Sequence, residues 1–269
     1  MKKEKYLHGY SQTEQARLYD QAKFLEPHFY DLIDFRKSKS VLEIGCGVGA
    51  QTKILLKKFP HIKISAVDRE LGQILQARKY LANYIKKDKV ELHLQDALNL
   101  TLDKKNFDGA FIMWFLEHVP SPLKALKEIK KHLKPGGTIF CTEVQNASFF
   151  LEPHSPAIIE FWNILNEVQV ALGGDPYVGA KLGNLLQEAK YKDIQIHVKP
   201  FYFDARTVKQ RKEFIEYWTG IMLSAIPAMK SKKRISSNLF KQMKKEVMII
   251  KKSKQSVFYY TAVQAVAKA

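Results

Sequence analysis

A glycine-rich turn between a short apolar run and a helical segment constrains the fold of this chain more than any other feature. Residues 40–45 read SVLEIG, and Gly45, Gly47 and Gly49 lead into a helical stretch over residues 50–59. Glycines let the backbone approach a ligand closely, and the N-terminus of the following helix offers unpaired N–H donors. The pattern predicts a strand, a tight turn and a helix beside a nucleotide-like ligand.

The same alternation continues along the chain. Further strands are predicted over residues 62–67, 90–94, 107–115 and 138–144, with helices over 71–84 and 121–132. Strands that alternate with helices form a parallel, doubly wound sheet. Two later apolar segments, 193–198 and 257–265, add two strands. The predicted fold is α/β, a Rossmann-like seven-stranded, mostly parallel sheet with helices on both faces.

Three parts of the chain are expected from this pattern. Residues 1–37 form a helical leader, in which Ser11 to Glu14 has the S-x-x-E form of a capping box. Residues 38–204 and 255–269 form the core, with an insertion at 148–179. Residues 205–254 form a helical cap inserted between the last two strands.

Acidic residues end three successive predicted strands. Glu43, Asp68 and Asp96 therefore meet at the carboxyl edge of the sheet, where open α/β sheets bind ligands. A carboxylate after the second strand can accept hydrogen bonds from both ribose hydroxyls, and an acidic rim suits a cationic ligand better than a pyrophosphate. Because Ala50 completes a G-x-G-x-x-A spacing, a nicotinamide-dependent oxidoreductase is the alternative.

Five segments stand in one order: VLEIGCGVG, AVD, LQDA, FDGAFIMWFLEHVPSP and LKPGG. In sequence and spacing they resemble the motifs of class I S-adenosylmethionine-dependent methyltransferases, over residues 38–200. The start YLHGYSQTEQARLYDQA resembles the leader of bacterial small-molecule methyltransferases. The resemblance implies S-adenosylmethionine as the cofactor.

By this resemblance Gly45 and Gly47 pass under the methionine portion of the cofactor, and Asp68 holds the ribose. Asp96 meets the adenine amino group and the Ala97 N–H its ring nitrogen, although a helix-capping or loop role is the alternative for Asp96.

The remaining cofactor contacts that the resemblance implies come from the second strand, the fourth strand and the leader. Arg69 flanks the adenosine, and Met113 and Trp114 line the floor beneath the sulfonium. Three leader residues close over the methionine end: Tyr10, Arg17 and Gln21. Arg17 suits a carboxylate, with an ordinary solvated helix residue as the alternative.

The chain carries no catalytic-triad or metal-ligand pattern, and no metal is expected. A sulfonium is an activated methyl donor, so the rate comes mainly from aligning nucleophile, methyl group and sulfur in line. The candidates for a catalytic role are His118, Tyr177 and Trp218. A structural hydrogen bond is the alternative for His118, and core packing is the alternative for the aromatic residues.

The net charge of +17 is concentrated in the last third of the chain, where residues 181–269 hold 19 basic and 6 acidic residues. Ten of the basic residues lie between residues 230 and 254 against Glu246 alone: Lys230, Lys232, Lys233, Arg234, Lys241, Lys244, Lys245, Lys251, Lys252 and Lys254. A small-molecule acceptor is favoured, and methylation of a protein or nucleic acid through this basic cap is the alternative. A non-catalytic binder of S-adenosylmethionine is the third possibility.

No apolar segment is long enough to span a membrane, since the longest apolar run, 110–116, has seven residues. The charged N-terminus lacks the apolar region of a secretory signal, so a cytoplasmic location is expected. Cys46 and Cys141 each lie in apolar stretches and are expected to pack as small hydrophobic residues. The oligomeric state has no signal in the sequence.

Overall fold

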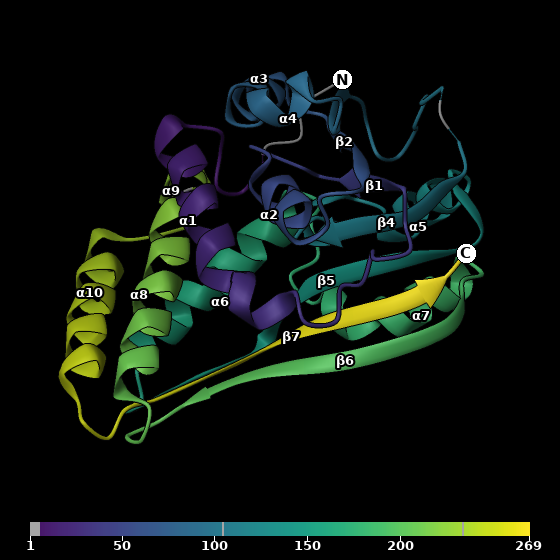
Figure 1. Ribbon diagram of the computed structural model, residues 1–269. Coiled ribbons are helices and arrows are strands. Elements are labelled where there is room, and N and C mark those ends of the chain that lie inside the picture. Colours follow the sequence, from purple (N-terminus) through teal and green to yellow (C-terminus); the bar gives the residue numbers. More distant parts are fainter. Residues whose placement is uncertain (1–5, 104, 233) are drawn as a thin grey trace.

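A single seven-stranded sheet organises the chain (Figure 1). The computed structural model describes residues 6–103, 105–232 and 234–269. The strands lie in the order β3-β2-β1-β4-β5-β7-β6. Their bounds are β1 Ser40–Ile44, β2 Lys63–Asp68, β3 Val90–Leu94, β4 Phe107–Met113, β5 Leu133–Glu152, β6 Lys192–Phe203 and β7 Val257–Lys268. β7 is antiparallel to β5 and β6, and the other neighbours pair in parallel, so the predicted mostly parallel sheet is confirmed.

Helices cover both faces of the sheet, as predicted. Their bounds are α1 Gln12–Phe29, α2 Ala50–Lys58, α3 Leu71–Tyr80, α4 Ala82–Lys86, α5 Pro122–Lys130, α6 Pro156–Ala171, α7 Leu182–Glu188, α8 Val208–Ser224, α9 Ile226–Ser231 and α10 Ser237–Lys252, with 3-10 turns η1 Leu116–His118 and η2 Val178–Lys181. Side chains of a strand alternate between two cores. Val41 packs with residues of α1, α2, α6 and α8, whereas Leu42 and Ile44 pack with residues of α5 and α7.

The leader helix begins at the capping box, as predicted, and ends at Phe29. The Ser11 hydroxyl accepts a hydrogen bond from the Glu14 N–H at 3.1 Å. Pro27 lies inside α1, which continues to Phe29, and the Phe29 side chain is buried in the core. Ser121 precedes α5, and its side chain makes no capping hydrogen bond.

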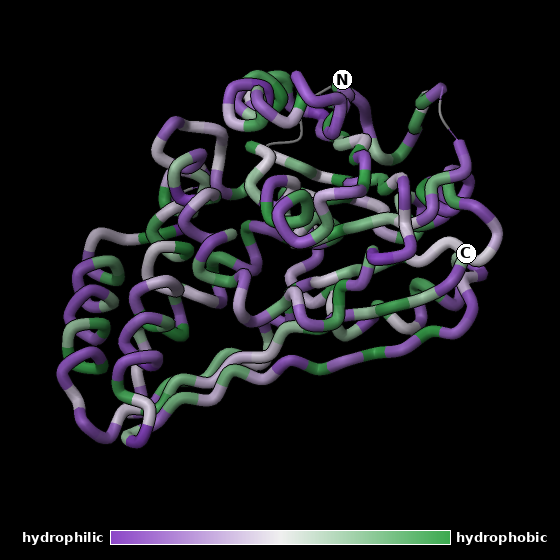
Figure 2. The backbone as a smooth tube through the Cα atoms, in the orientation of Figure 1, coloured by the Kyte–Doolittle hydropathy of each residue, from purple (hydrophilic) through white to green (hydrophobic). Residues whose placement is uncertain are grey.

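The last three strands of the sheet are longer than the sequence indicates. β5 runs past residue 144 to Glu152, so the first residues of the expected insertion at 148–179 belong to a strand. β5 is longer because it pairs with β7. The pairing is irregular after Gln145 and resumes where Phe150 of β5 lies opposite Tyr259 of β7. β6 also extends to Phe203 beside β7, and Figure 2 shows its alternating hydrophilic and hydrophobic residues.

Three helices, α8, α9 and α10, lie between β6 and β7 in the chain. Figure 1 shows α8 and α10 at one end of the sheet, with α1 and α6 nearby, and α10 outermost. α10 packs against α6 and α8. None of the helices in the described part of the chain is long and apolar enough to cross a membrane.

Candidate active site

A deep cavity opens at the carboxyl edge of the sheet. Its walls come from the turn after β1, the ends of β2, β3 and β4, the leader, and helices α6 and α8. All the residues predicted for the site line it except Glu43 and Tyr177. Those that do are Tyr10, Arg17, Gln21, Gly45, Gly47, Asp68, Arg69, Asp96, Ala97, Met113, Trp114, His118 and Trp218.

The turn after β1 requires glycine for two different reasons. Gly45 has φ +72°, and a Cβ there would lie 2.5 Å from the ring of Phe115. Gly47 has φ +53°, and a Cβ there would meet nothing within 4 Å. The left-handed backbone is adopted readily by glycine. Gly47 therefore leaves open space at the cavity wall that a larger residue would fill.

Asp68 is bound to this turn by its carboxylate. One oxygen accepts from the Gly47 N–H at 2.8 Å, and the other accepts from the Glu70 N–H at 2.9 Å. Burial raises the pKa of Asp68, while the two backbone hydrogen bonds oppose that rise. The acid at the end of β2 is thus fixed next to the glycine turn.

Asp96 lies at the other end of the same wall and is exposed. Its carboxylate accepts a hydrogen bond from the Leu98 N–H at 2.9 Å, a local turn interaction. The loop role considered for this residue is therefore present, and Asp96 still faces the cavity.

Glu43 does not belong to the acidic rim expected from the sequence. Its side chain is buried with 2% of its surface exposed and does not line the cavity. Burial raises the pKa of Glu43 to about 8, the Thr52 hydroxyl lowers it and the Asp68 carboxylate raises it. A strand that is buried along its whole length leaves this side chain no route to solvent.

The raised pKa of Glu43 predicts a pH-dependent stability. The folded chain holds a proton that the unfolded chain releases, so the stabilisation is fully present below the ordinary pKa of 4.5 and is lost as the pH rises to about 8. Glu43→Gln stays neutral and removes this dependence. We expect the wild type to lose about 2–4 kcal/mol relative to the variant across this window.

Urea unfolding at several pH values measures this difference, with the exposed Glu160→Gln as a control. Parallel stability curves for the wild type and Glu43→Gln would show that Glu43 is ionised in the folded chain.

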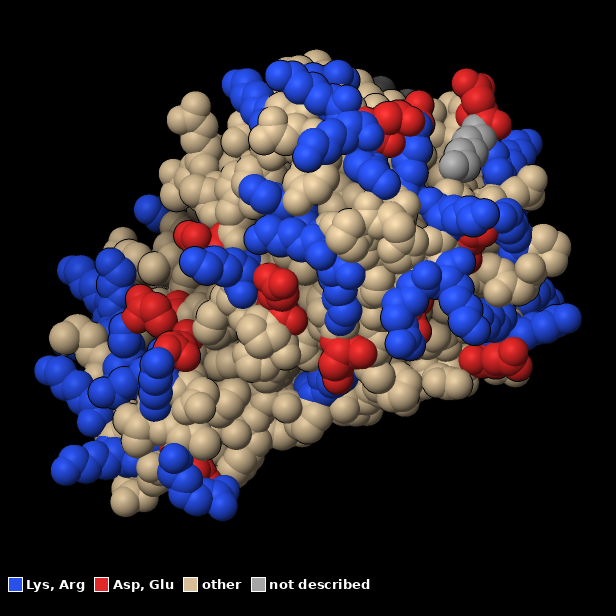
Figure 3. All heavy atoms as spheres, viewed as in Figure 1, with Lys and Arg blue, Asp and Glu red and all other residues tan. Residues whose placement is uncertain are grey.

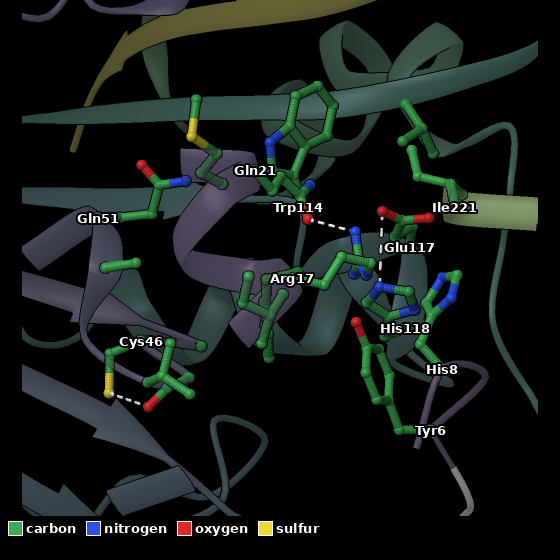
Figure 4. Close-up of a pocket in the computed structure, with 18 of the residues that line it drawn as sticks. Tyr6, His8, Arg17, Gln21, Cys46, Gln51, Trp114, Glu117, His118 and Ile221 are labelled. Carbon is green, nitrogen blue, oxygen red and sulfur yellow. Dashed lines mark hydrogen bonds and ion pairs between the residues drawn. The ribbon is translucent and has the colours of Figure 1, made fainter. Parts of the chain in front are cut away.

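Arg17 lies in the cavity but is already paired. Its Nε and Nη2 donate to the two carboxylate oxygens of Glu14 at 2.7 and 2.6 Å, and its Nη1 donates to Gln21 at 2.9 Å. A guanidinium has five N–H donors, so donors remain for a ligand carboxylate. Figure 4 shows Arg17 beside Glu117 and His118.

Two histidines and a tyrosine, of which only His118 was predicted, share this end of the cavity (Figure 4). The ring of Tyr6 contacts that of His118 edge-on with centroids 4.7 Å apart. Burial lowers the pKa of His8 well below its usual value and also lowers the pKa of His118. Both imidazoles are therefore neutral at physiological pH.

The hydrogen bond that Ser224 makes to the Ile221 carbonyl favours one tautomer of His8. The Ser224 hydroxyl donates to the Ile221 carbonyl at 2.8 Å, so its oxygen accepts from Nδ1–H of His8 at 2.7 Å. The lone pair of His8 is then on Nε2. His118 lies 3.5 Å from a Glu117 oxygen and 3.4 Å from the Gln169 amide nitrogen.

Trp114 has an unusual backbone for a bulky residue. Its φ is +55°, in the left-handed region, and its N–H donates to the Thr142 carbonyl at 2.9 Å. Such strain costs on the order of 1–3 kcal/mol and persists where the surrounding structure imposes it. The indole N–H groups of Trp114 and Trp218 find no acceptor within the described residues.

Tyr177 lies outside the cavity, contrary to its selection as a candidate. It belongs to the loop before η2, where its N–H donates to the Asp175 carboxylate at 3.1 Å, and 37% of its surface is exposed. Trp218 does line the cavity and also packs on Tyr260 of β7, with ring centroids 4.3 Å apart.

Comparison with known proteins gives a consistent result. Residues 42–141 match the profile of a methyltransferase domain family. The demethylmenaquinone methyltransferase of Symbiobacterium thermophilum is 33% identical over 110 residues, which are 40% of this chain and 44% of that protein. The malonyl-[acyl-carrier protein] O-methyltransferase of Priestia megaterium is 33% identical over 118 residues, 43% of this chain and 40% of that protein. The chain thus matches less than half the length of these relatives.

The fold has solved counterparts. The phosphoethanolamine N-methyltransferase 2 of Haemonchus contortus, solved with S-adenosyl-L-methionine, superimposes with a TM-score of 0.54 at 16% identity, over 93% of this chain and 52% of that one. The sheet, the glycine turn and the matched segment define a class I S-adenosylmethionine-dependent methyltransferase fold. Residues 42–141 are thus similar to the methyltransferase domain family, and the fold is shared with this solved methyltransferase.

Proposed function

We propose that the protein transfers a methyl group from S-adenosylmethionine to a small, largely apolar acceptor. The observation that carries the proposal is one continuous cavity, which joins the glycine turn and Asp68 to an aromatic end formed by α6 and α8. The relatives named demethylmenaquinone methyltransferase and malonyl-[acyl-carrier protein] O-methyltransferase support a small or carrier-bound acceptor.

The residues at the glycine-turn end of the cavity fit the cofactor. The open space at Gly47 admits a ligand beside the backbone, Asp68 lies against the turn to accept from hydroxyls, and Arg17 retains donors for a carboxylate. When bound, the cofactor supplies a methyl group on a positively charged sulfur. The chain then has to orient the acceptor and exclude water.

The acceptor end is apolar with few free polar groups. Trp162 donates its indole N–H to the Asn146 carbonyl at 3.0 Å, and Tyr260 donates to the Asn146 side chain at 2.9 Å. The indole N–H groups of Trp114 and Trp218 have no acceptor within the described residues and can donate to an oxygen of the acceptor. A planar molecule that carries hydroxyl or carbonyl oxygens fits such a lining.

Methylation of a hydroxyl releases a proton, and the chain has neutral groups to take it. The acceptor oxygen supplies the electron pair of the new bond to the methyl carbon, and the sulfur keeps the pair of the broken bond. Nε2 of His8 carries a lone pair in the tautomer that Ser224 selects, so we assign the proton to His8, with His118 beside it.

Calorimetry tests the cofactor assignment. We expect micromolar binding of S-adenosylhomocysteine and no binding of NAD, because the wall around Asp68 and Asp96 is acidic. Incubation with methyl-labelled S-adenosylmethionine and a panel of quinols, phenols and carboxylic acids then tests the acceptor class. Binding of NAD without S-adenosylhomocysteine would sink the proposal.

A further inference from the structure

The outer face of α10 combines basic and aliphatic side chains. The inner face of the helix consists of its buried residues, Leu239, Met243, Val247 and Ile250. The outer stripe holds Lys241, Lys245, Met248 and Lys252, which are spaced four, three and four residues apart. Met248 and its neighbour Ile249 each have 57% of their surface exposed. The four positions three and four residues from Met248 are all lysines.

The positive charge of this face is not neutralised locally. Glu246, the acid of α10, turns inward and accepts hydrogen bonds from the N–H groups of Ala157 and Ile158 at 3.1 and 2.9 Å, at the start of α6. Lys251 pairs with Glu216. No ion pair is found for Lys241, Lys245 or Lys252 within the described residues, and all three are exposed.

More cations lie on the segments that flank α10. Lys230, Lys232 and Lys254 are exposed before and after the helix, while Lys233 lies outside the described residues. Figure 3 shows the lysines and arginines gathered along the edge of the molecule where Figure 1 places α10.

The geometry points to the outer face of α10 as a docking surface for an anionic lipid bilayer. Lysine side chains keep their ammonium groups at the level of the phosphates, and exposed aliphatic side chains between them enter the boundary of the acyl chains. Each lysine near an anionic surface contributes additively to binding. A single-stranded nucleic acid would need aromatic side chains for base stacking, whereas Met248 and Ile249 are aliphatic.

A second hollow lies between α1 and α8, and Lys251 is the residue of α10 that lines it. It shares Arg17, Gln21 and Tyr217 with the main cavity. The docking proposal does not rest on the proposed function.

Sedimentation with lipid vesicles tests the docking. We expect the protein to bind vesicles of phosphatidylglycerol and phosphatidylcholine in equal parts, and not vesicles of phosphatidylcholine alone. The triple change Lys241→Gln, Lys245→Gln and Lys252→Gln should weaken binding at least about tenfold. Exposed lysines on α3 and in the α4 region give a control with the same change of charge: Lys79→Gln, Lys86→Gln and Lys87→Gln.

A second pair of variants tests the aliphatic residues. Met248→Gln with Ile249→Gln keeps the charge and should weaken vesicle binding, whereas the exposed pair Leu71→Gln with Leu75→Gln should not. Equal binding of the wild type to neutral and anionic vesicles overturns the docking proposal. So does a loss of vesicle binding in the control variants that equals the loss in the α10 variants. Binding of RNA that the α10 lysine changes abolish and the Met248 and Ile249 changes spare would assign this face to nucleic acid instead.

Binding of S-adenosylhomocysteine is measured in parallel on every variant. If vesicle binding fails while this ligand still binds, the docking proposal falls and the proposed function stands. If the ligand fails to bind to the wild type, the proposed function falls whatever the vesicles show.

Discussion

Asp68→Ala should lower the affinity for S-adenosylhomocysteine more than tenfold. A hydrogen bond to a charged group contributes about 1.5–3 kcal/mol, and the proposed function assigns this carboxylate to two ribose hydroxyls. The change also removes the acceptor of the Gly47 N–H, so the glycine turn loses one hydrogen bond to β2 and keeps those of Gly45 and Cys46 to the Val67 carbonyl. Calorimetry on the purified variant measures the affinity.

Asp108→Ala is the matched control. Its carboxylate also accepts from two backbone N–H groups, those of Lys39 and Ser40, both at 2.8 Å, but it does not line the cavity. We expect the control to lose stability and to bind the ligand like the wild type. Wild-type affinity in a folded Asp68→Ala variant would remove Asp68 from the site.

Of the variants proposed for this chain, Glu143→Ala should lower the free energy of unfolding the most. The buried Glu143 carboxyl accepts from the N–H groups of Phe115, Leu116 and Glu117 at 3.1, 2.7 and 3.4 Å. These residues form the turn after β4 that leads to His118. A buried N–H left without a partner costs about 1–3 kcal/mol, so we expect the free energy of unfolding to fall by at least about 3 kcal/mol.

Glu143→Gln tests whether the hydrogen bonds cause this loss. Its carbonyl oxygen can accept from Phe115 and Leu116, so the variant should recover most of the stability. Burial raises the pKa of Glu143 well above its usual range, as does the nearby Glu117, so a neutral amide suits the position. Urea denaturation compares the three proteins. Equal stability of the alanine variant and the wild type would mean that water or a shift of the turn replaces the carboxyl.

The cofactor end of the site was predictable because its parts are local in sequence. Gly45 and Gly47 lie within three residues of the end of β1, Asp68 ends β2, and Ala97 lies three residues after β3. Parallel strands bring their carboxyl ends to one edge. The same rule placed Glu43 there and could not show that its side chain is enclosed. The pattern of apolar residues in the sequence indicates where a strand ends. The burial of a side chain on that strand depends on which other segments pack against it.

The acceptor end depends on contacts between distant segments, and so most of it was missed. His8 is bonded to Ser224 across 216 positions of the chain, and Tyr6 meets His118. Glu117 and Gln169 are joined by a 2.8 Å hydrogen bond between η1 and α6. A signal for His8 and Tyr6 was present in the leader, in YLHGYSQ, but no local rule pairs it with η1 or α8.

The position of β7 determines when the acceptor end can form during synthesis. β7 lies between β5 and β6 but follows β6 and α8–α10 in the chain. When β6 leaves the ribosome, the strand that will bind it in the sheet has not yet been made. Trp218 of α8 likewise has no ring contact with Tyr260 until β7 has been synthesised. The glycine turn and Asp68 can thus assemble on β1–β5 first. The aromatic end of the cavity is complete only after β7 has inserted between β5 and β6.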